Sequence, residues 1–208
     1  YIDLDGNKVI DRGDNRLVDG DMGDQTIIGN TTPRYQYTFN GYISWKGLSL
    51  SVMFQGVGKR DWVAGGAYFW GFGPYAQVTV FKEHMDYWRP DNPGAYYPKP
   101  YINSAGGVAP YQDKNIQRTD LYLQNAAYCR LKNIQLSYTL PRTWLKKLRM
   151  KSAMVFVNAQ NLFTITDFYQ GFDPEVAYSG SGDGVELGAV AYNYPQVKVV
   201  TMGVELKF

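Results

Sequence analysis

The chain has 208 residues, 16% of them aromatic and 22 of them glycine, and its formal net charge is +2. The near-neutral charge gives no basic field of the kind that binds nucleic acid, and the single cysteine, Cys129, excludes an internal disulfide framework. No run approaches the roughly 18 apolar residues of a membrane-spanning helix. Transmembrane strands have a weaker sequence signal, and the lack of such a run does not exclude them.

Acidic residues dominate the first segment, which we expect to be a loop over residues 1–33. Oxygen-bearing side chains recur in DLDGNKVIDRGD at Asp3, Asp5, Asn7, Asp11 and Asp14. Calcium prefers about six to eight hard oxygen ligands, and short loops supply them at such spacings. The stretch departs from an EF-hand, because Lys8 replaces the expected glycine and Asp14 is shorter than the usual glutamate. We predict a calcium site at these five positions, and the alternative is a solvated acidic turn.

Alternation of apolar and polar residues predicts a hairpin over residues 34–58. In RYQYTFNGYISW the aromatic and aliphatic residues share one parity, and LSLSVMFQG repeats that pattern. A period of two is typical of a strand with one apolar face. The connection Lys46-Gly47 is short enough for a hairpin turn.

The segment 59–120 is expected to be a long loop rich in aromatic residues. Flat rings suit sugar rings, and the candidates for substrate binding are Trp62, Trp70 and Trp88. The alternative is that the rings pack the loop on itself or against a lid protein. His84 is the only histidine, so no histidine cluster suggests a metal centre or a catalytic triad. The carboxylate pairs Glu83/Asp86 and Asp173/Glu175 are interpreted as solvated loop charges, and we predict no enzymatic activity.

Two further strands are expected within residues 121–166, and a last one over 198–208. The strand in CRLKNIQLSYTLP has poor parity near Arg130 and Lys132, and we expect this end either to bulge or to stand above the apolar zone. The next strand, in SAMVFVNAQNLFTIT, alternates less regularly. A basic stretch, PRTWLKKLRMK, joins the two, and we interpret it as a short amphipathic helix at a membrane surface with its basic groups near lipid headgroups; the alternative is a solvated turn. A second long loop occupies residues 167–197.

Two architectures fit this alternation. Short turns that alternate with long loops are typical of an outer-membrane barrel, whose strands need about ten residues to cross the hydrocarbon. A soluble, calcium-stabilised, carbohydrate-binding β-sandwich would show similar strands. The two differ in what covers the apolar side of Met202, Leu206 and Phe208, which is lipid in the barrel and a second sheet in the sandwich.

Several stretches of the sequence resemble the C-terminal part of the SusC-type (SusC/RagA-like) TonB-dependent transporters. In order along the chain they are DQTIIGN, TPRYQYTFN, LSLSVMFQGVG, YCRLKNIQLSYTLP, FVNAQNLFTIT and YQGFDPEV, followed by the alternating end at Phe208. Together they span nearly the whole chain. The resemblance is weakest over the long loop between Lys59 and Asp120.

This resemblance implies an all-β, transmembrane antiparallel β-barrel of about 22 strands, of which this chain supplies about five. The N-terminal plug would lie outside this chain, since we expect Tyr1 to follow a longer precursor. Relatives import large nutrients, mostly oligosaccharides and sometimes peptides, with a SusD-like surface lipoprotein as lid and energy from the TonB complex. The outer membrane is then the expected location, with the long loops extracellular and the C-terminus periplasmic.

Overall fold

The computed structural model describes residues 2–11, 13, 22–63, 69–70, 80–102, 108–109, 118–147, 149–169, 171–176 and 194–208. Its strands are β1 (Arg34–Trp45), β2 (Leu48–Lys59), β3 (Asp61–Val63), β4 (Tyr101–Ile102), β5 (Val108–Ala109), β6 (Leu123–Asn125), β7 (Tyr128–Thr139), β8 (Ser152–Gln160), β9 (Thr164–Thr166) and β10 (Val199–Lys207). Short helices are η1 (Lys82–Met85), η2 (Asp120–Tyr122) and α2 (Arg142–Lys147).

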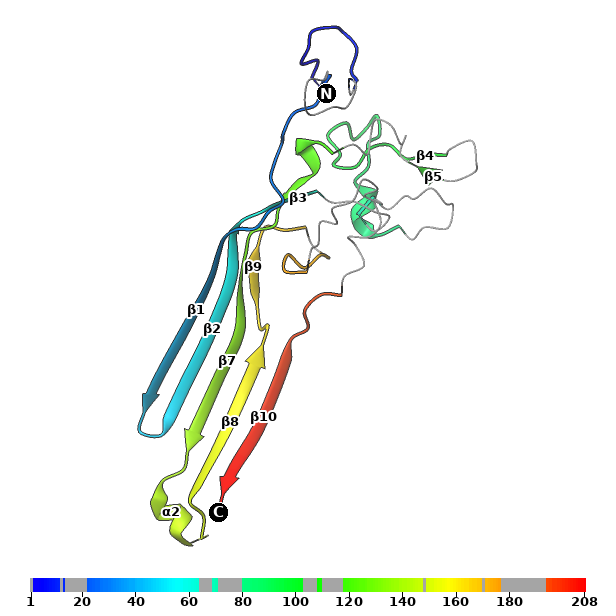
Figure 1. Cartoon of the computed structure of the whole chain (residues 1–208). Coiled ribbons are helices and arrows are strands. Elements are labelled where there is room, and N and C mark those ends of the chain that lie inside the picture. Colours follow the sequence, from blue (N-terminus) through cyan, green and yellow to red (C-terminus); the bar gives the residue numbers. More distant parts are fainter. Residues whose placement is uncertain are drawn as a thin grey trace.

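One antiparallel sheet contains all the long strands, in the order β1-β2-β7-β8-β10, with β9 attached to β7. Figure 1 shows these strands side by side in a single layer, with the loops gathered at one end and α2 and the C-terminus at the other. The five strands expected from alternation are these five long strands, so the all-β, antiparallel class is confirmed.

The register collects the apolar residues on one face of this sheet. A single row crosses all five strands through paired residues: Ile43, Leu50, Leu136, Val157 and Met202. The neighbouring row consists of polar residues: Tyr42, Ser51, Gln135, Asn158 and Thr201. Because side chains alternate across a strand, the first row lies on one face and the second on the other.

Two positions of the first hairpin, Gly47 and Gly56, favour glycine for different reasons. Lys46 and Gly47 have φ of 48° and 86°, the pair of positive values that a two-residue hairpin turn requires. Within β2, a Cβ on Gly56 would lie 2.3 Å from the carbonyl oxygen of Tyr128 and 2.4 Å from the hydroxyl of Tyr37. The ring of Tyr37 therefore lies across the glycine of the neighbouring strand, and a larger residue at position 56 would have to displace this ring and the backbone of Tyr128.

The irregular parity near Lys132 marks a real bulge. Met53 pairs with Asn133 while Phe54 pairs with Leu131, so Lys132 is the extra residue on β7. Of the two expectations for this end of the strand, the bulge is confirmed. The run expected to continue to Thr166 is divided instead, because β8 ends at Gln160 and Asn161 has a φ of 52°. Asparagine tolerates this left-handed conformation, and β9 then pairs with β7 in a shifted register.

The main cluster of buried hydrophobic residues lies in the loops beyond the sheet. Its buried members are Trp62, Phe69, Trp70, Tyr97, Tyr122, Ala126 and Phe168. The short pair β3–β6 belongs to this region, since Trp62 is in β3 and Tyr122 directly precedes β6. The chain therefore builds its core around the loops, while the apolar face of the long strands stays without one.

None of the helices in the described part of the chain has the length and apolar character needed to cross a lipid bilayer.

Candidate functional site

The apolar face of the long sheet is exposed in this chain. Met202 is 78% exposed, Phe208 74% and Ile43 66%, values that are extreme for large hydrophobic side chains. Among the described residues the other sheets are the two-stranded pairs β3–β6 and β4–β5, which belong to the loop end (Figure 1), and neither covers this face. The β-sandwich alternative required such a cover, so this face needs an apolar environment from elsewhere.

The opposite face carries polar side chains that bond to one another across strands. The hydroxyl of Tyr42 donates to Ser49 Oγ at 3.2 Å, and Ser49 Oγ donates to Ser44 Oγ at 3.0 Å. On β8, Asn158 Nδ2 donates to Asn133 Oδ1 on β7 at 2.6 Å. Such a face tolerates water, which is the complement of the apolar face.

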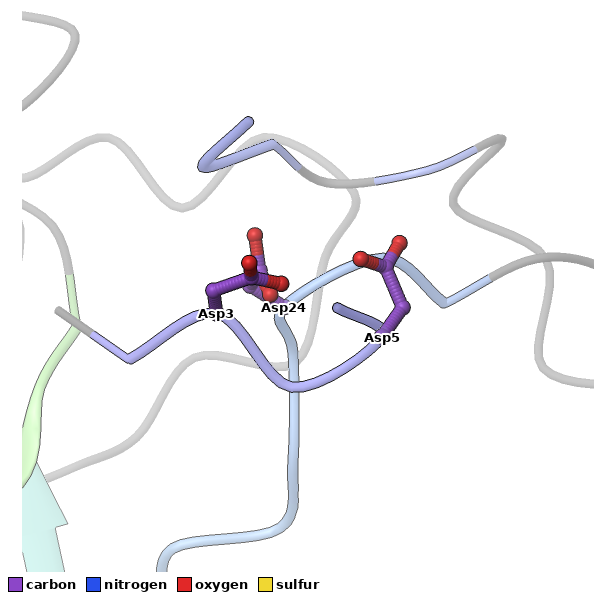
Figure 2. A group of neighbouring side chains, drawn as sticks. All are labelled: Asp3, Asp5 and Asp24. Carbon is purple, nitrogen blue, oxygen red and sulfur yellow. The ribbon is translucent and has the colours of Figure 1, made fainter. Parts of the chain in front are cut away.

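Three carboxylates meet in the N-terminal loop. Figure 2 shows Asp3, Asp5 and Asp24 close together, and their oxygen atoms lie within 4.8 Å of one another. Asp3 and Asp5 belong to the predicted set, whereas Asp24 was not predicted. Asp24 begins the stretch DQTIIGN, and no known ligand spacing in the sequence links it to Asp3 and Asp5. Two hydrogen bonds hold Asp24 in the cluster. The Asp24 N–H donates to the Asp11 carbonyl, and the Asp11 N–H donates to the Asp24 carboxylate.

The remaining predicted ligands have other roles or lie outside the described residues. Asn7 donates from Nδ2 to Asp5 Oδ2 at 2.8 Å, and its Oδ1 accepts the Val9 N–H at 2.6 Å. Asp11 Oδ1 accepts the N–H of Gly13 at 2.7 Å. Asp14 lies outside the described residues. Of the predicted set, the structure brings Asp3 and Asp5 together, and it adds Asp24 to them.

Backbone amides and like charges act in opposite directions within this cluster. The N–H groups of Leu4 and Asp11 hold the pKa of the Asp24 carboxyl below its ordinary value. At Asp5 the N–H of Asn7 also lowers the pKa. Desolvation and the neighbouring acids Asp3 and Asp24 outweigh it, so the pKa of Asp5 is raised. Three carboxylates at this spacing repel one another, and the donor chemistry fits a hard divalent cation such as Ca²⁺.

Two of the three candidate tryptophans are packing residues in this structure. Trp62 is 1% exposed and Trp70 4%, and their rings contact Phe168 and Tyr122 at centroid distances of 5.1 and 4.7 Å. Trp88 is different, because it is 40% exposed. It borders a cavity of ≈ 330 Å³ whose lining also includes Tyr96, Tyr97, Pro98, Lys99 and Leu121. Trp88 is therefore the candidate whose ring a ligand can reach.

The buried His84 fixes the loop around these rings. Its Nδ1 accepts the N–H of Phe81 at 2.9 Å, and this assigns the proton to Nε2, which donates to the carbonyl of Phe69 at 3.0 Å. Nearby, the hydroxyls of Tyr97 and Tyr169 lie 2.7 Å apart. Burial and this hydrogen bond raise the pKa of Tyr97 above its ordinary value. These polar groups are satisfied within the loop assembly.

An ion-pair network fastens the last loop to β7. Arg130 Nη2 lies 2.7 Å from Asp173 Oδ1, Arg130 also pairs with Glu175, and Lys132 Nζ lies 2.8 Å from Glu175 Oε1. Arg130 and Asp173 are buried. The interpretation of Asp173 and Glu175 as solvated loop charges is wrong. Parity showed the bulge that presents Lys132, but no sequence signal paired these side chains.

Asp173 is the acceptor that organises this network. Its Oδ1 accepts the Glu175 N–H and its Oδ2 accepts the Gln196 N–H, each at 2.9 Å. Burial alone would raise the pKa of Asp173, but the guanidinium of Arg130 and these two amides outweigh burial and hold the pKa below its ordinary value. One carboxylate thereby joins β7, the loop after β9 and the segment before β10.

The search for related proteins gives no matching family model. Two relatives from Formosa agariphila are similar along nearly the whole chain: TonB-dependent receptor P3, 29% identical over 211 residues, and TonB-dependent receptor P26, 26% identical over 208 residues. They match 100% and 98% of this chain, which spans only 19% and 20% of their own lengths.

Solved structures give the same relationship. The RagAB peptide importer in the closed-closed state has 28% identity and a TM-score of 0.63, and its open-open state has 26% identity and a TM-score of 0.60. Both matches cover 90% of this chain and 18% of the matched chain.

Proposed function

Because the chain is a segment of a TonB-dependent receptor of the SusC type, we propose that it forms part of the wall and loops of an outer-membrane importer of large nutrients. The observation that carries this proposal is the uncovered apolar face of the long sheet. Strands β8 and β10 have 9 residues and β1, β2 and β7 have 12. A tilted strand needs about 9–11 residues to cross the hydrocarbon, so these strands are long enough.

In this proposal the loop end is extracellular and the turn end is periplasmic. The short β1–β2 turn, α2 and the C-terminus share one end of the sheet, whereas the aromatic loops share the other (Figure 1). Outer-membrane barrels have short periplasmic turns and longer extracellular loops, which supports this orientation. The free edges of β1 and β10 would pair with further strands of the receptor, since unpaired backbone groups cannot face lipid.

The transported substrate is proposed to be an oligosaccharide, taken up with a SusD-like surface lipoprotein as lid and with energy from the TonB complex. The exposed ring of Trp88 beside its cavity supports a planar contact with a sugar ring. The solved relatives are described as a peptide importer, so a peptide is the alternative substrate.

Growth of a deletion strain tests this proposal. We expect loss of growth on one class of polysaccharide and recovery with the wild-type gene. Complementation with Trp88→Ala should recover poorly, whereas Trp88→Phe should recover more. Loss of growth on protein sources instead would replace the oligosaccharide by peptides. Unchanged growth on every carbon and nitrogen source would contradict the import function. Co-purification of a SusD-like lipoprotein with the tagged receptor, identified by mass spectrometry, tests the partner.

We also propose that the cluster of Asp3, Asp5 and Asp24 binds Ca²⁺ in the extracellular medium, where calcium is abundant enough for a weak site. Isothermal titration of the chelator-treated receptor should show one equivalent of Ca²⁺ fewer in Asp24→Asn than in the wild type. Asp91→Asn is the matched control, because Asp91 is an exposed loop acid with only a surface partner. Equal stoichiometry in the wild type and Asp24→Asn would refute the site.

A further inference from the structure

The turn end of the sheet combines three segments that hydrogen bonds hold together. The Thr139 N–H donates to the Gly47 carbonyl at 2.8 Å, which joins the β1–β2 turn to the end of β7. The Lys151 N–H donates to the Lys207 carbonyl at 2.8 Å, which joins the β7–β8 connection to the end of β10. Figure 1 shows the β1–β2 turn, α2 and the C-terminus at this same end. The end is therefore one continuous surface.

This surface is strongly basic. The connection from Pro141 to Lys151 contains cations at Arg142, Lys146, Lys147, Arg149 and Lys151 and has no Asp or Glu. Of the described side chains here, Lys207 pairs with Glu205 at 2.8 Å. Within the described part of the chain, Arg142, Lys146 and Arg149 form no ion pair with a carboxylate. Unneutralised cations on one surface predict an anionic partner.

Exposed aromatic rings lie beside these cations. Trp45 is 67% exposed, Trp144 60% and Phe208 74%, while Leu145 next to Trp144 is buried and anchors α2. Lys46 Nζ lies 4.8 Å from the ring centroid of Trp45. Trp45 ends the apolar row of β1, so the exposed face passes from aliphatic residues to rings and then to cations. This order matches hydrocarbon, interface and headgroup of a bilayer.

We infer that the turn end binds anionic phospholipid headgroups in the periplasmic leaflet of the membrane, a proposal that rests on the membrane location proposed above. The cations contact lipid phosphates, and the rings of Trp45 and Trp144 lie at the level of the glycerol backbone. Charge complementarity and continuity with the apolar face select a lipid surface over a soluble anionic partner. The surface fixes how deep the sheet sits in the bilayer.

Native mass spectrometry of the full-length receptor, titrated with phosphatidylglycerol or phosphatidylcholine of equal chain length, tests the inference. The test variant is Arg142→Gln, Arg149→Gln and Lys151→Gln. The control variant removes equal charge at the loop end through Lys59→Gln, Lys82→Gln and Arg118→Gln. We expect the wild type to prefer phosphatidylglycerol, and the test variant to lose about tenfold or more of that preference. The control variant should keep the preference.

Several results would overturn the inference. They are an unchanged preference in the test variant, an equal loss in the control variant, or displacement of lipid by inorganic phosphate at matched concentration, which would indicate a free-anion site. Heat-modifiable mobility on gels checks folding, and the charge-conserving variant Arg142→Lys with Arg149→Lys should retain the preference. A receptor that imports its nutrient but shows no lipid preference would refute this inference alone. A receptor absent from the outer membrane would refute the proposed function.

Discussion

Replacement of Arg130 by methionine should release the last loop from strand β7. Arg130 Nη2 lies 2.7 Å from Asp173 Oδ1, and their side chains are only 4% and 5% exposed. Methionine approximates the length of the arginine stem but leaves the Asp173 carboxylate buried without its cation. Asp173 also accepts the Glu175 and Gln196 amides, so the whole junction depends on a charge that the variant no longer balances.

The expected cost follows from the burial of the pair. Removal of one partner of a buried ion pair destabilises by about 3–5 kcal/mol, because the other charge remains buried and uncompensated. Lys132 still reaches Glu175, whose side chain is 20% exposed, so part of the network survives. We therefore expect the lower limit, about 3 kcal/mol for local opening, which corresponds to a change of roughly a hundredfold in the opening equilibrium.

Hydrogen exchange of the full-length receptor in detergent measures this opening. Peptides that contain the Glu175 and Gln196 amides should lose roughly a hundredfold in protection in Arg130→Met. Arg34→Met is the matched control, because Arg34 and Asp61 lie 3.8 Å apart with side chains 39% and 22% exposed. Such a pair contributes about 0–1 kcal/mol. Protection in Arg130→Met that stays within a few-fold of the wild type would refute the reasoning.

Two further predictions follow from single positions. Gly56→Ala should destabilise the receptor by about 1–3 kcal/mol, since the new Cβ meets the backbone oxygen of Tyr128, whereas Gly94→Ala, with no atom within 4 Å, should be neutral in the same urea titration. Equal midpoints for the two variants would contradict the close approach. The pKa of Asp173 is lowered from 3.8, so its stabilisation is complete above that value and is lost as the pH falls through the lower folded value. Protection of the Gln196 amide, relative to an unstructured peptide at each pH, should be constant from neutral pH to about 5 and fall below pH 3.8, and a flat profile would exclude this linkage.

The long strands were predictable because each has one apolar face and one polar face along its whole length. Alternation along each strand places Ile43, Met202 and the apolar residues paired between them on one face, and no other sheet among the described residues covers that face. Parity even located the bulge at Lys132, where the alternation fails. The local pattern was sufficient here because every long strand of the sheet follows the same alternation of apolar and polar residues.

The candidate site was less predictable, because its contacts join distant parts of the chain. Arg130 and Asp173 are 43 positions apart and Leu4 reaches Asp24 across 20, and neither spacing has a periodic signature. Trp62 and Trp88 look equivalent in sequence, yet one is buried in the aromatic cluster and the other borders a cavity. Only the folded loops distinguish a packing ring from an accessible one.

Lipid contact of the apolar face is most directly measured by the accessibility of spin labels. In the receptor reconstituted in liposomes, with Cys129 replaced by alanine and other cysteines removed, single labels at Met202→Cys and Thr201→Cys report the two faces of β10. We expect the label at 202 to collide with oxygen dissolved in the bilayer and to be shielded from a water-soluble nickel complex, with the opposite preference at 201. Access of the nickel complex to both labels, or shielding of residue 202 from oxygen as well as nickel, would contradict the membrane account.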